Sequence, residues 1–352
     1  MSLPPDAPPD SERYSRQILF PFIGVEGQRK ISASSAVVVG CGALGSVTAS
    51  LLARAGVGRL RVIDRDFVEV SNLQRQVLFD EDDAREARPK AAAAADKLSR
   101  VNPSIEVEGI VTDVNPDNVV DLTRGFSLIL DGTDNFETRF LLNDVSVRHD
   151  IPWIYAACLG SYGLTMNILP GETACLSCVM ESAPPPGSVP TCDTAGILGP
   201  VVSIVSGLQS TEALKLLSGN REALSRELVS IDGWTQVMTR VEVPRGGGRR
   251  RCATCDGLEF LWLSGRGSRS TTICGRNAVQ VLPEGGGVLD MEALAARLAA
   301  SGSAREVART RFLIRFEAEG LKVAVFPDGR AIVTGTKEPG VARGLYARYI
   351  GA

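Results

Sequence analysis

Apolar and polar positions alternate along the chain with two different periods. A continuous apolar run at residues 36–39 predicts a buried strand, and helically spaced apolar residues at 46–55 predict a helix that stops at Gly56. Another apolar run at 60–63 predicts a second strand, which ends at Asp64. This strand–helix–strand order is typical of a parallel sheet with helices packed on it.

The same order continues toward the middle of the chain. Two uncharged segments are interrupted by Gly, Pro and Ser, so they predict buried strands and a buried helix rather than membrane spans. We therefore predict the α/β fold class, with a doubly wound, mostly parallel, Rossmann-like sheet. The further predicted elements are a helical lead-in at 11–30, a helix at 89–100, strands at 105–111, 128–130 and 153–156, and the uncharged segments at 151–171 and 194–211.

A different pattern begins beyond residue 264 and predicts a small α+β domain. Its predicted strands lie at 278–282, 312–317, 322–326 and 331–334, and its predicted helices at 290–300 and 341–349. The chain therefore divides into an N-terminal helical arm (1–30), a main α/β domain (31–263) that closes with a loop at 239–256, and the C-terminal domain (264–352).

Composition narrows the function classes without selecting one. Hydrophobic residues make up 44% and charged residues 22% of the chain, and the net charge is -3. These values give no electrostatic argument for a nucleic-acid partner or an anionic membrane. Residues 1–10 are Pro-rich and acidic, unlike a signal peptide, so we expect a cytoplasmic protein. The single histidine, His149, leaves little scope for histidine acid–base catalysis.

A glycine-rich turn joins the first predicted strand to its helix. Gly40, Gly42 and Gly45 would let the backbone approach a phosphate at the helix N-terminus, and Asp64 could accept a hydrogen bond from a ribose. The alternative is that the glycines serve only a tight turn. Taken alone, this pattern favours an NAD-dependent oxidoreductase that uses the 40–45 turn.

The residues after Asp64 shift the interpretation toward a triphosphate. Asn72, Gln74 and Arg75 supply clustered polar groups where a dehydrogenase needs one ribose anchor. Pro89 and Lys90 place another cation at the start of a helix, although a lysine there is also explained as a solvated surface residue.

Two carboxylates follow another predicted strand. Asp131 and Asp134 come just past its carboxyl end, where open α/β sheets bind ligands, and such a carboxylate can hold Mg2+ shared with phosphates. The alternative is helix capping by Asp134 or Asn135. The sequence contains no P-loop motif, so a nucleotide must be held in another way.

The cysteines form a metal-site pattern. Cys175, Cys178, Cys252 and Cys255 make two C-x-x-C pairs, which predict a closed four-thiolate zinc site of structural character, with redox chemistry as the weaker alternative. Cys192 lies in a Pro- and Gly-bounded loop and is a candidate nucleophile, although a free loop thiol explains it equally well.

In its order of motifs the chain resembles the ThiF/MoeB/HesA family, bacterial relatives of the E1 ubiquitin-activating enzymes. The resemblance covers roughly residues 12–260 and rests on residues 13–17, the glycine turn 40–45, Asp64, residues 71–75, Lys90 and residues 133–135. It implies that MgATP adenylylates the C-terminal glycine of a small ubiquitin-like sulfur-carrier protein ending in Gly-Gly, of the molybdopterin or thiamine type. Pyrophosphate is released before sulfur is transferred, and a sulfurtransferase is a further candidate partner.

The resemblance also implies roles for individual residues. Asp64 would bind the ribose, Arg75 and Lys90 the phosphates and Asp134 the magnesium, while Arg16 would reach into a partner subunit's ATP site in a homodimer. A cysteine at the place of Cys192 takes the activated acyl group in some members, and the family carries zinc at the four-cysteine place. The residues expected to line the ATP pocket are Gly40, Gly42, Ala43, Gly45, Asp64, Asp66, Ser71, Asn72, Leu73, Gln74, Arg75, Lys90, Asp134 and Asn135.

The C-terminal domain departs from the minimal pattern of that family. Its position after the cysteine pairs and its separate α+β pattern suggest docking of the carrier or of a downstream sulfur-transfer partner. A purely structural addition is an equally good explanation.

Overall fold

The computed structural model describes residues 12–184, 195–248, 251–266, 272–273, 278–281 and 289–351. Within them, one sheet of eight strands is ordered β3-β2-β1-β4-β5-β6-β7-β8. The strands from β3 to β5 run parallel to one another, and β6, β7 and β8 continue the sheet antiparallel. The strands are β1 (Ser35–Val39), β2 (Arg59–Ile63), β3 (Glu106–Ile110), β4 (Ile129–Asp131), β5 (Trp153–Leu159), β6 (Tyr162–Ile168), β7 (Leu228–Asp232) and β8 (Val237–Val241).

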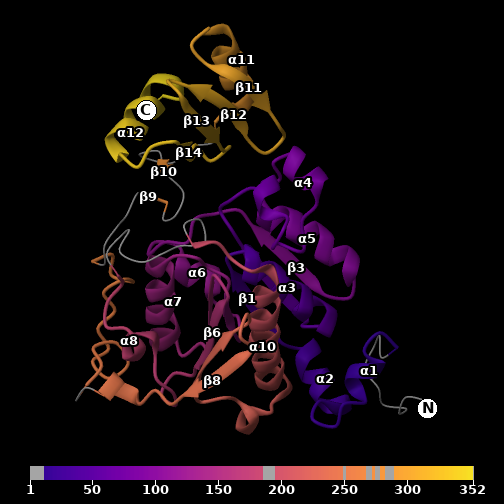
Figure 1. Ribbon diagram of the computed structural model, residues 1–352. Coiled ribbons are helices and arrows are strands. Elements are labelled where there is room, and N and C mark those ends of the chain that lie inside the picture. The colour runs from indigo at the N-terminus through magenta and orange to yellow at the C-terminus, as the bar shows by residue number, and fades with distance from the viewer. Residues whose placement is uncertain are drawn as a thin grey trace.

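Helices cover both faces of this main sheet (Figure 1). They are α1 (Ser15–Ile18), α2 (Gly24–Ser32), α3 (Ala43–Ala55), α4 (Glu81–Arg85), α5 (Lys90–Val101), α6 (Val119–Thr123), α7 (Phe136–His149), α8 (Leu176–Val179) and α10 (Gly199–Ser218), with short 3-10 turns η1 (Val70–Asn72), η2 (Arg221–Ala223) and η3 (Arg245–Gly248). No helix in the described ranges is long and apolar enough to cross a membrane.

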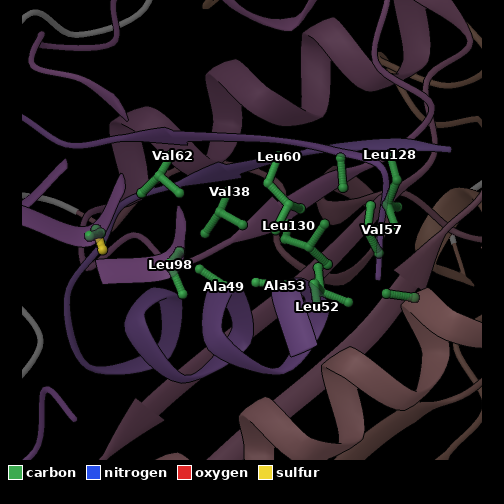
Figure 2. Close-up of a cluster of buried hydrophobic side chains, with 14 of the residues drawn as sticks. Val38, Ala49, Leu52, Ala53, Val57, Leu60, Val62, Leu98, Leu128 and Leu130 are labelled. Carbon is green, nitrogen blue, oxygen red and sulfur yellow. The ribbon is translucent and has the colours of Figure 1, made fainter. Parts of the chain in front are cut away.

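Strand β1 is apolar on both sides because both of its faces are covered. Val38 packs with Leu60 of β2 against Leu52 of α3, as Figure 2 shows. The next residue along the strand, Val39, faces the opposite side and joins Phe140 of α7. Because successive strand residues point to opposite faces, an uninterrupted apolar run is what a central parallel strand requires. The predicted α/β doubly wound fold is therefore confirmed.

The end of the chain forms a second, smaller sheet, which we call the C-terminal unit together with its two helices. Its strands are ordered β11-β12-β13-β14-β10-β9 and pair antiparallel. The strands are β9 (Thr272–Ile273), β10 (Ala278–Val281), β11 (Arg305–Arg309), β12 (Ile314–Ala318), β13 (Leu321–Val325) and β14 (Ala331–Thr334), and the helices are α11 (Met291–Ala300) and α12 (Pro339–Tyr349). The expected small α+β fold is confirmed, while the exact domain boundaries stay predictions.

Two details of the predicted elements are wrong. The segment 239–256 begins inside β8, so it is not entirely a loop, and the strands β7 and β11 were not expected at all. All five residues of β8 are exposed, and β11 is exposed at four of its five residues. Both strands lie at the outer edge of a sheet. They therefore lack the apolar signal on which recognition of a strand depends.

Candidate functional site

The carboxyl ends of β1, β2 and β4, which carry predicted site residues, lie at one edge of the main sheet. At this edge, glycines pack backbone against backbone. A Cβ atom on Gly45 would lie 1.8 Å from the carbonyl oxygen of Gly40, and one on Gly132 would lie 2.2 Å from the same oxygen. Gly40 also has a φ of +87°, which favours glycine. A Cβ on Gly42 would meet only Gln76 Nε2 at 3.9 Å. Glycines 40, 45 and 132 are thus required by packing, whereas Gly42 borders open space.

The first turn of helix α3 lies beside the open space at Gly42. Gly42 is its N-cap, no side chain caps its first turn, and Ala43 is its first residue. The first N–H groups of a helix have no partner within the helix, and the helix dipole adds positive potential there. An uncapped helix start beside a glycine turn is a suitable place for a phosphate.

Asp64 follows β2 and ties the glycine turn to the next segment. Its Oδ2 accepts a hydrogen bond from the backbone N–H of Cys41 at 2.6 Å, and its Oδ1 accepts one from the N–H of Asp66 at 2.7 Å. Burial raises the pKa of Asp64, and the nearby Lys90 ammonium opposes this rise. Asp64 is therefore a fixed, partly buried carboxylate at the edge where a ribose is expected.

Lys90 is buried, at 2% exposure, so the explanation as a solvated surface lysine is wrong. Its Nζ lies 3.3 Å from Asp66 Oδ2, and its backbone N–H donates to the Asp66 carbonyl oxygen at 2.9 Å. A buried ammonium keeps its charge only beside an opposite charge. The pair places a cation and a carboxylate next to Asp64.

Of residues 71–75, some are buried and make structural contacts, and the others are exposed to solvent. The buried Asn72 accepts a hydrogen bond from the backbone N–H of Glu69 at 3.2 Å as part of the η1 capping box, and Leu73 packs against the core. Ser71 and Gln74 are exposed. The partly exposed Arg75 donates from Nη1 to the carbonyl oxygen of Ser71 at 2.9 Å.

Three polar side chains at the end of β4 and just after it have different surroundings. Asp131 is fully buried, and its Oδ1 accepts from the backbone N–H of Thr133 at 2.9 Å and from its hydroxyl at 2.7 Å. Asn135 accepts from the N–H of Thr138 at 2.8 Å, so its side chain caps α7. Asp134 is exposed and makes no hydrogen bond or ion pair within the described part of the chain. It is the carboxylate of this segment that can meet a ligand.

Four residues that hold this edge together were not among the predicted site residues. Arg139 lies 3.5 Å from Asp131 Oδ2 through its Nε, and Gln209 Nε2 donates to the Asp131 carbonyl oxygen at 2.9 Å. Arg65 Nη1 lies 2.7 Å from Asp113 Oδ1. Asp113 comes shortly after β3, so the rule on strand ends could have found it. The other available signal was a polar Gln209 within the mostly apolar, uncharged segment 194–211.

Arg16 lies far from this edge in its own chain. Its helix α1 is fixed by Tyr14, whose ring sits where a Cβ on Gly56 would be, 2.5 Å away, at the C-terminal end of α3. Asn102 Nδ2 donates to the Tyr14 hydroxyl at 2.8 Å. The glycine turn is at the other end of α3, about 20 Å away along a 13-residue helix. Arg16 is exposed and does not join the other predicted residues.

The four predicted metal ligands come together beside α7. The sulfur atoms of Cys175, Cys178, Cys252 and Cys255 all lie within 4.8 Å of one another. Three of the sulfur–sulfur distances are 3.8, 3.7 and 3.5 Å, close to the distance of about 3.8 Å between ligands of a tetrahedral zinc with Zn–S near 2.3 Å. This cluster could hold a metal such as zinc. Cys192 lies outside the described residues.

Comparisons with known proteins show the family to which the chain belongs. Residues 14–252 match the model of the ThiF family. The chain is 43% identical over 342 residues to the sulfur carrier protein ThiS adenylyltransferase of Bacillus subtilis, covering 96% of this chain and 99% of that protein. It is 37% identical over 249 residues to the sulfur carrier protein adenylyltransferase of Thermus thermophilus, covering 69% of this chain and 90% of the relative.

Among solved structures, E. coli MccB with ATP has a similar fold. The TM-score is 0.61 at 24% identity, over 70% of this chain and 75% of that one. The two relatives above are named as adenylyltransferases, so the oxidoreductase alternative has no support. The chain belongs to the ThiF family and is an E1-like adenylyltransferase.

Proposed function

We propose that this chain uses ATP to adenylylate the C-terminal glycine carboxylate of a small ubiquitin-like sulfur-carrier protein. The observation that carries the proposal is the meeting of an uncapped helix start, the buried cation of Lys90 and the exposed carboxylate of Asp134 at one sheet edge. Hydride transfer needs no such combination, whereas a triphosphate needs cations and a metal-binding carboxylate.

The chemistry requires positioning more than covalent help. A carboxylate oxygen of the carrier's last glycine attacks the α-phosphorus of ATP, the bond from that phosphorus to the bridging oxygen breaks, and pyrophosphate leaves. In this proposal Asp64 orients the ribose, and Lys90 and Arg75 balance charge on the departing phosphates. Asp134 would hold Mg2+, which would neutralise part of the same charge when bound.

The relatives favour a carrier of the ThiS type. The match to the Bacillus ThiS adenylyltransferase covers 96% of this chain, so it includes most of the C-terminal unit. The match to the Thermus relative covers only 69% of this chain although it takes in 90% of that protein. A shared C-terminal unit therefore supports a carrier of the ThiS type.

The cysteine cluster is proposed to be a structural zinc site. Four thiolates leave no open coordination position, which excludes a role in activating water or substrate at that metal. The zinc would join α8 to the segment after η3, two parts of the chain that lie far apart in sequence. Cys192 remains a candidate acceptor of the activated acyl group, and a sulfurtransferase a candidate partner of the adenylylated carrier.

Pyrophosphate exchange into ATP tests the function directly. We expect wild-type protein to catalyse exchange with a ThiS-type carrier that ends in Gly-Gly. The same carrier without its last two glycines, and a molybdopterin-type carrier, should support it at least tenfold less. Equal exchange with all three carriers, or none with any, would contradict the proposal. Exchange that survives in Asp134→Ala and Arg75→Ala would overturn the site assignment alone.

A further inference from the structure

The C-terminal unit packs one face of its sheet on the nucleotide edge. Along β14, Val333 faces α11 and α12, whereas Ile332 lies on the opposite face, in a cluster with residues between β2 and α5 of the main unit. Phe326, which follows β13, also points to the main unit, where it meets Phe67 and Ala87. Figure 1 shows the unit beside the region of α4 and α5. The sheet of the C-terminal unit is thus covered on both faces.

The segments under this face are those that carry the predicted ATP ligands. Phe67 follows Asp66 and forms an isolated antiparallel bridge with Pro89, which precedes Lys90. The Phe67 and Phe326 rings have centroids 6.1 Å apart. The C-terminal unit therefore contacts both segments that this bridge joins, one at Phe67 and the other at Ala87.

Arg330 is the polar centre of this contact. It is 2% exposed, its Nη1 donates to the carbonyl oxygen of Arg65 at 2.6 Å, and its guanidinium lies 3.9 Å from the Phe326 ring centroid. Its Nη2 has no hydrogen-bond partner within the described residues. Burial lowers the pKa of Arg330, while the charges of Asp328 and Asp66 oppose this effect.

A second polar contact supports the same segment. Gln280 Nε2 donates to Asp113 Oδ2 at 3.1 Å, and Asp113 Oδ1 in turn pairs with Arg65 at 2.7 Å. Arg65 is therefore held twice, by its carbonyl oxygen through Arg330 and by its side chain through Asp113. The residues on either side of it in the sequence are Asp64 and Asp66.

We propose that Arg330 is a positioning residue for ATP: it fixes the 64–66 turn from the C-terminal unit, so the nucleotide and that unit stabilise each other. The inference rests on the proposed function, in which Asp64 orients the ribose. Coupling of this kind is reciprocal, because a contact that favours ATP binding must itself be favoured by bound ATP. A contact that only joins the two units would stabilise the protein without such coupling.

Steady-state kinetics separate the two roles. In Arg330→Met we expect the KM for ATP to rise about tenfold, as for loss of one charge-assisted hydrogen bond, while kcat and the KM for the carrier change less than twofold. Arg330→Lys, which keeps a positively charged donor group, should recover part of the ATP affinity. Arg348→Met is the matched control, because Arg348 is exposed and pairs with Glu319 inside the C-terminal unit at 2.7 Å. A lowered Tm with an unchanged KM for ATP would overturn the inference.

Hydrogen exchange measures the reciprocal effect without turnover. Saturating MgATP without carrier should slow amide exchange in β13 and β14 at least threefold in wild type and in Arg348→Met, but less than 1.5-fold in Arg330→Met. If Arg330→Met does not fold, Gln280→Met replaces it, with the same direction expected. Equal slowing in variant and wild type would refute the coupling. Failure of wild type to bind MgATP by calorimetry would instead refute the proposed function.

Discussion

At the scale of single residues, a buried charge pair decides what the nucleotide edge can bind. Lys90 is nearly inaccessible and lies beside Asp66, so its ammonium is held in place before any ligand arrives. A cation that is already positioned needs no reorganisation when phosphate charge develops. The same burial makes the pair costly to break, because the remaining charge loses its main partner.

We expect Lys90→Met to abolish pyrophosphate exchange, by at least a hundredfold, and to destabilise the fold by about 2 kcal/mol. The double variant Asp66→Asn, Lys90→Met should regain most of the stability, because both charges of the pair are removed together, and should stay inactive. Thermal unfolding and exchange assays on both proteins check this. Recovery of activity along with stability would show that Lys90 serves only the fold.

At the scale of elements, the cysteine cluster joins parts of the chain that secondary structure leaves apart. Cys178 in α8 accepts a hydrogen bond from the backbone N–H of Gly246 in η3 at 3.2 Å. A Cβ on Gly247 would lie 2.0 Å from the Cys178 carbonyl oxygen, so the two segments are in direct backbone contact.

Removal of metal by a strong chelator is expected to lower the Tm by at least 5 °C, because metal binding to preformed thiolates contributes to folding free energy. Elemental analysis should give one zinc per chain before treatment. Exchange activity per folded molecule should change little at temperatures below the transition. Absence of zinc, or an unchanged Tm after chelation, would remove the assignment.

Helix α7 holds the segment after the cysteines through one buried carboxylate. Asp144 Oδ2 accepts from the backbone N–H groups of Trp262 at 2.8 Å and Leu263 at 3.1 Å, and the Trp262 ring stacks on Phe140. Burial raises the pKa of Asp144 to about 6, although the two N–H groups oppose the rise.

A raised pKa in the folded state makes this contact pH-dependent. The folded protein binds the Asp144 proton more tightly than the unfolded chain does, so this contribution to stability is full below about pH 4 and is lost as the pH rises through about 6. The Asp144→Asn variant has no ionisable group at this position, so it does not lose this stability as the pH rises. The Tm of the variant should therefore rise relative to the Tm of wild type as the pH increases from about 4 to 7. A difference in Tm between the two proteins that stays the same at every pH would contradict this prediction.

At the scale of the whole molecule, the elements that bury an apolar face and the residues that belong to motifs could be predicted from the sequence. Central strands such as β1 and the helices of the C-terminal unit follow from apolar periodicity. The strands β8 and β11 were missed because they lie at sheet edges and bury little. Asp64 and Asp134, which follow the ends of β2 and β4, were named in advance, whereas Asp113, which follows β3, was not. Arg330 was not, because its contact is with a carbonyl oxygen of Arg65, far away in sequence, and leaves no side-chain pattern.

A homodimer that shares Arg16 between subunits would show complementation. Arg16→Ala and Lys90→Met are each expected to be inactive, since each dimer lacks one component of both sites. After the two proteins are mixed and allowed to exchange subunits, mixed dimers hold one intact site, so activity should return to about a quarter of wild type. Lack of recovery in a mixture that has demonstrably exchanged subunits would exclude sharing of Arg16.

The sheet of the C-terminal unit has apolar side chains on two faces, and this affects how the protein can be divided. Cutting the chain before β9 would uncover Phe326, Leu313 and Ile332 on one fragment and Phe67 on the other. Contiguous apolar surfaces of this kind promote aggregation. Neither fragment is therefore expected to stay in solution by itself at high concentration. Produced together, the two fragments should associate and remain dispersed.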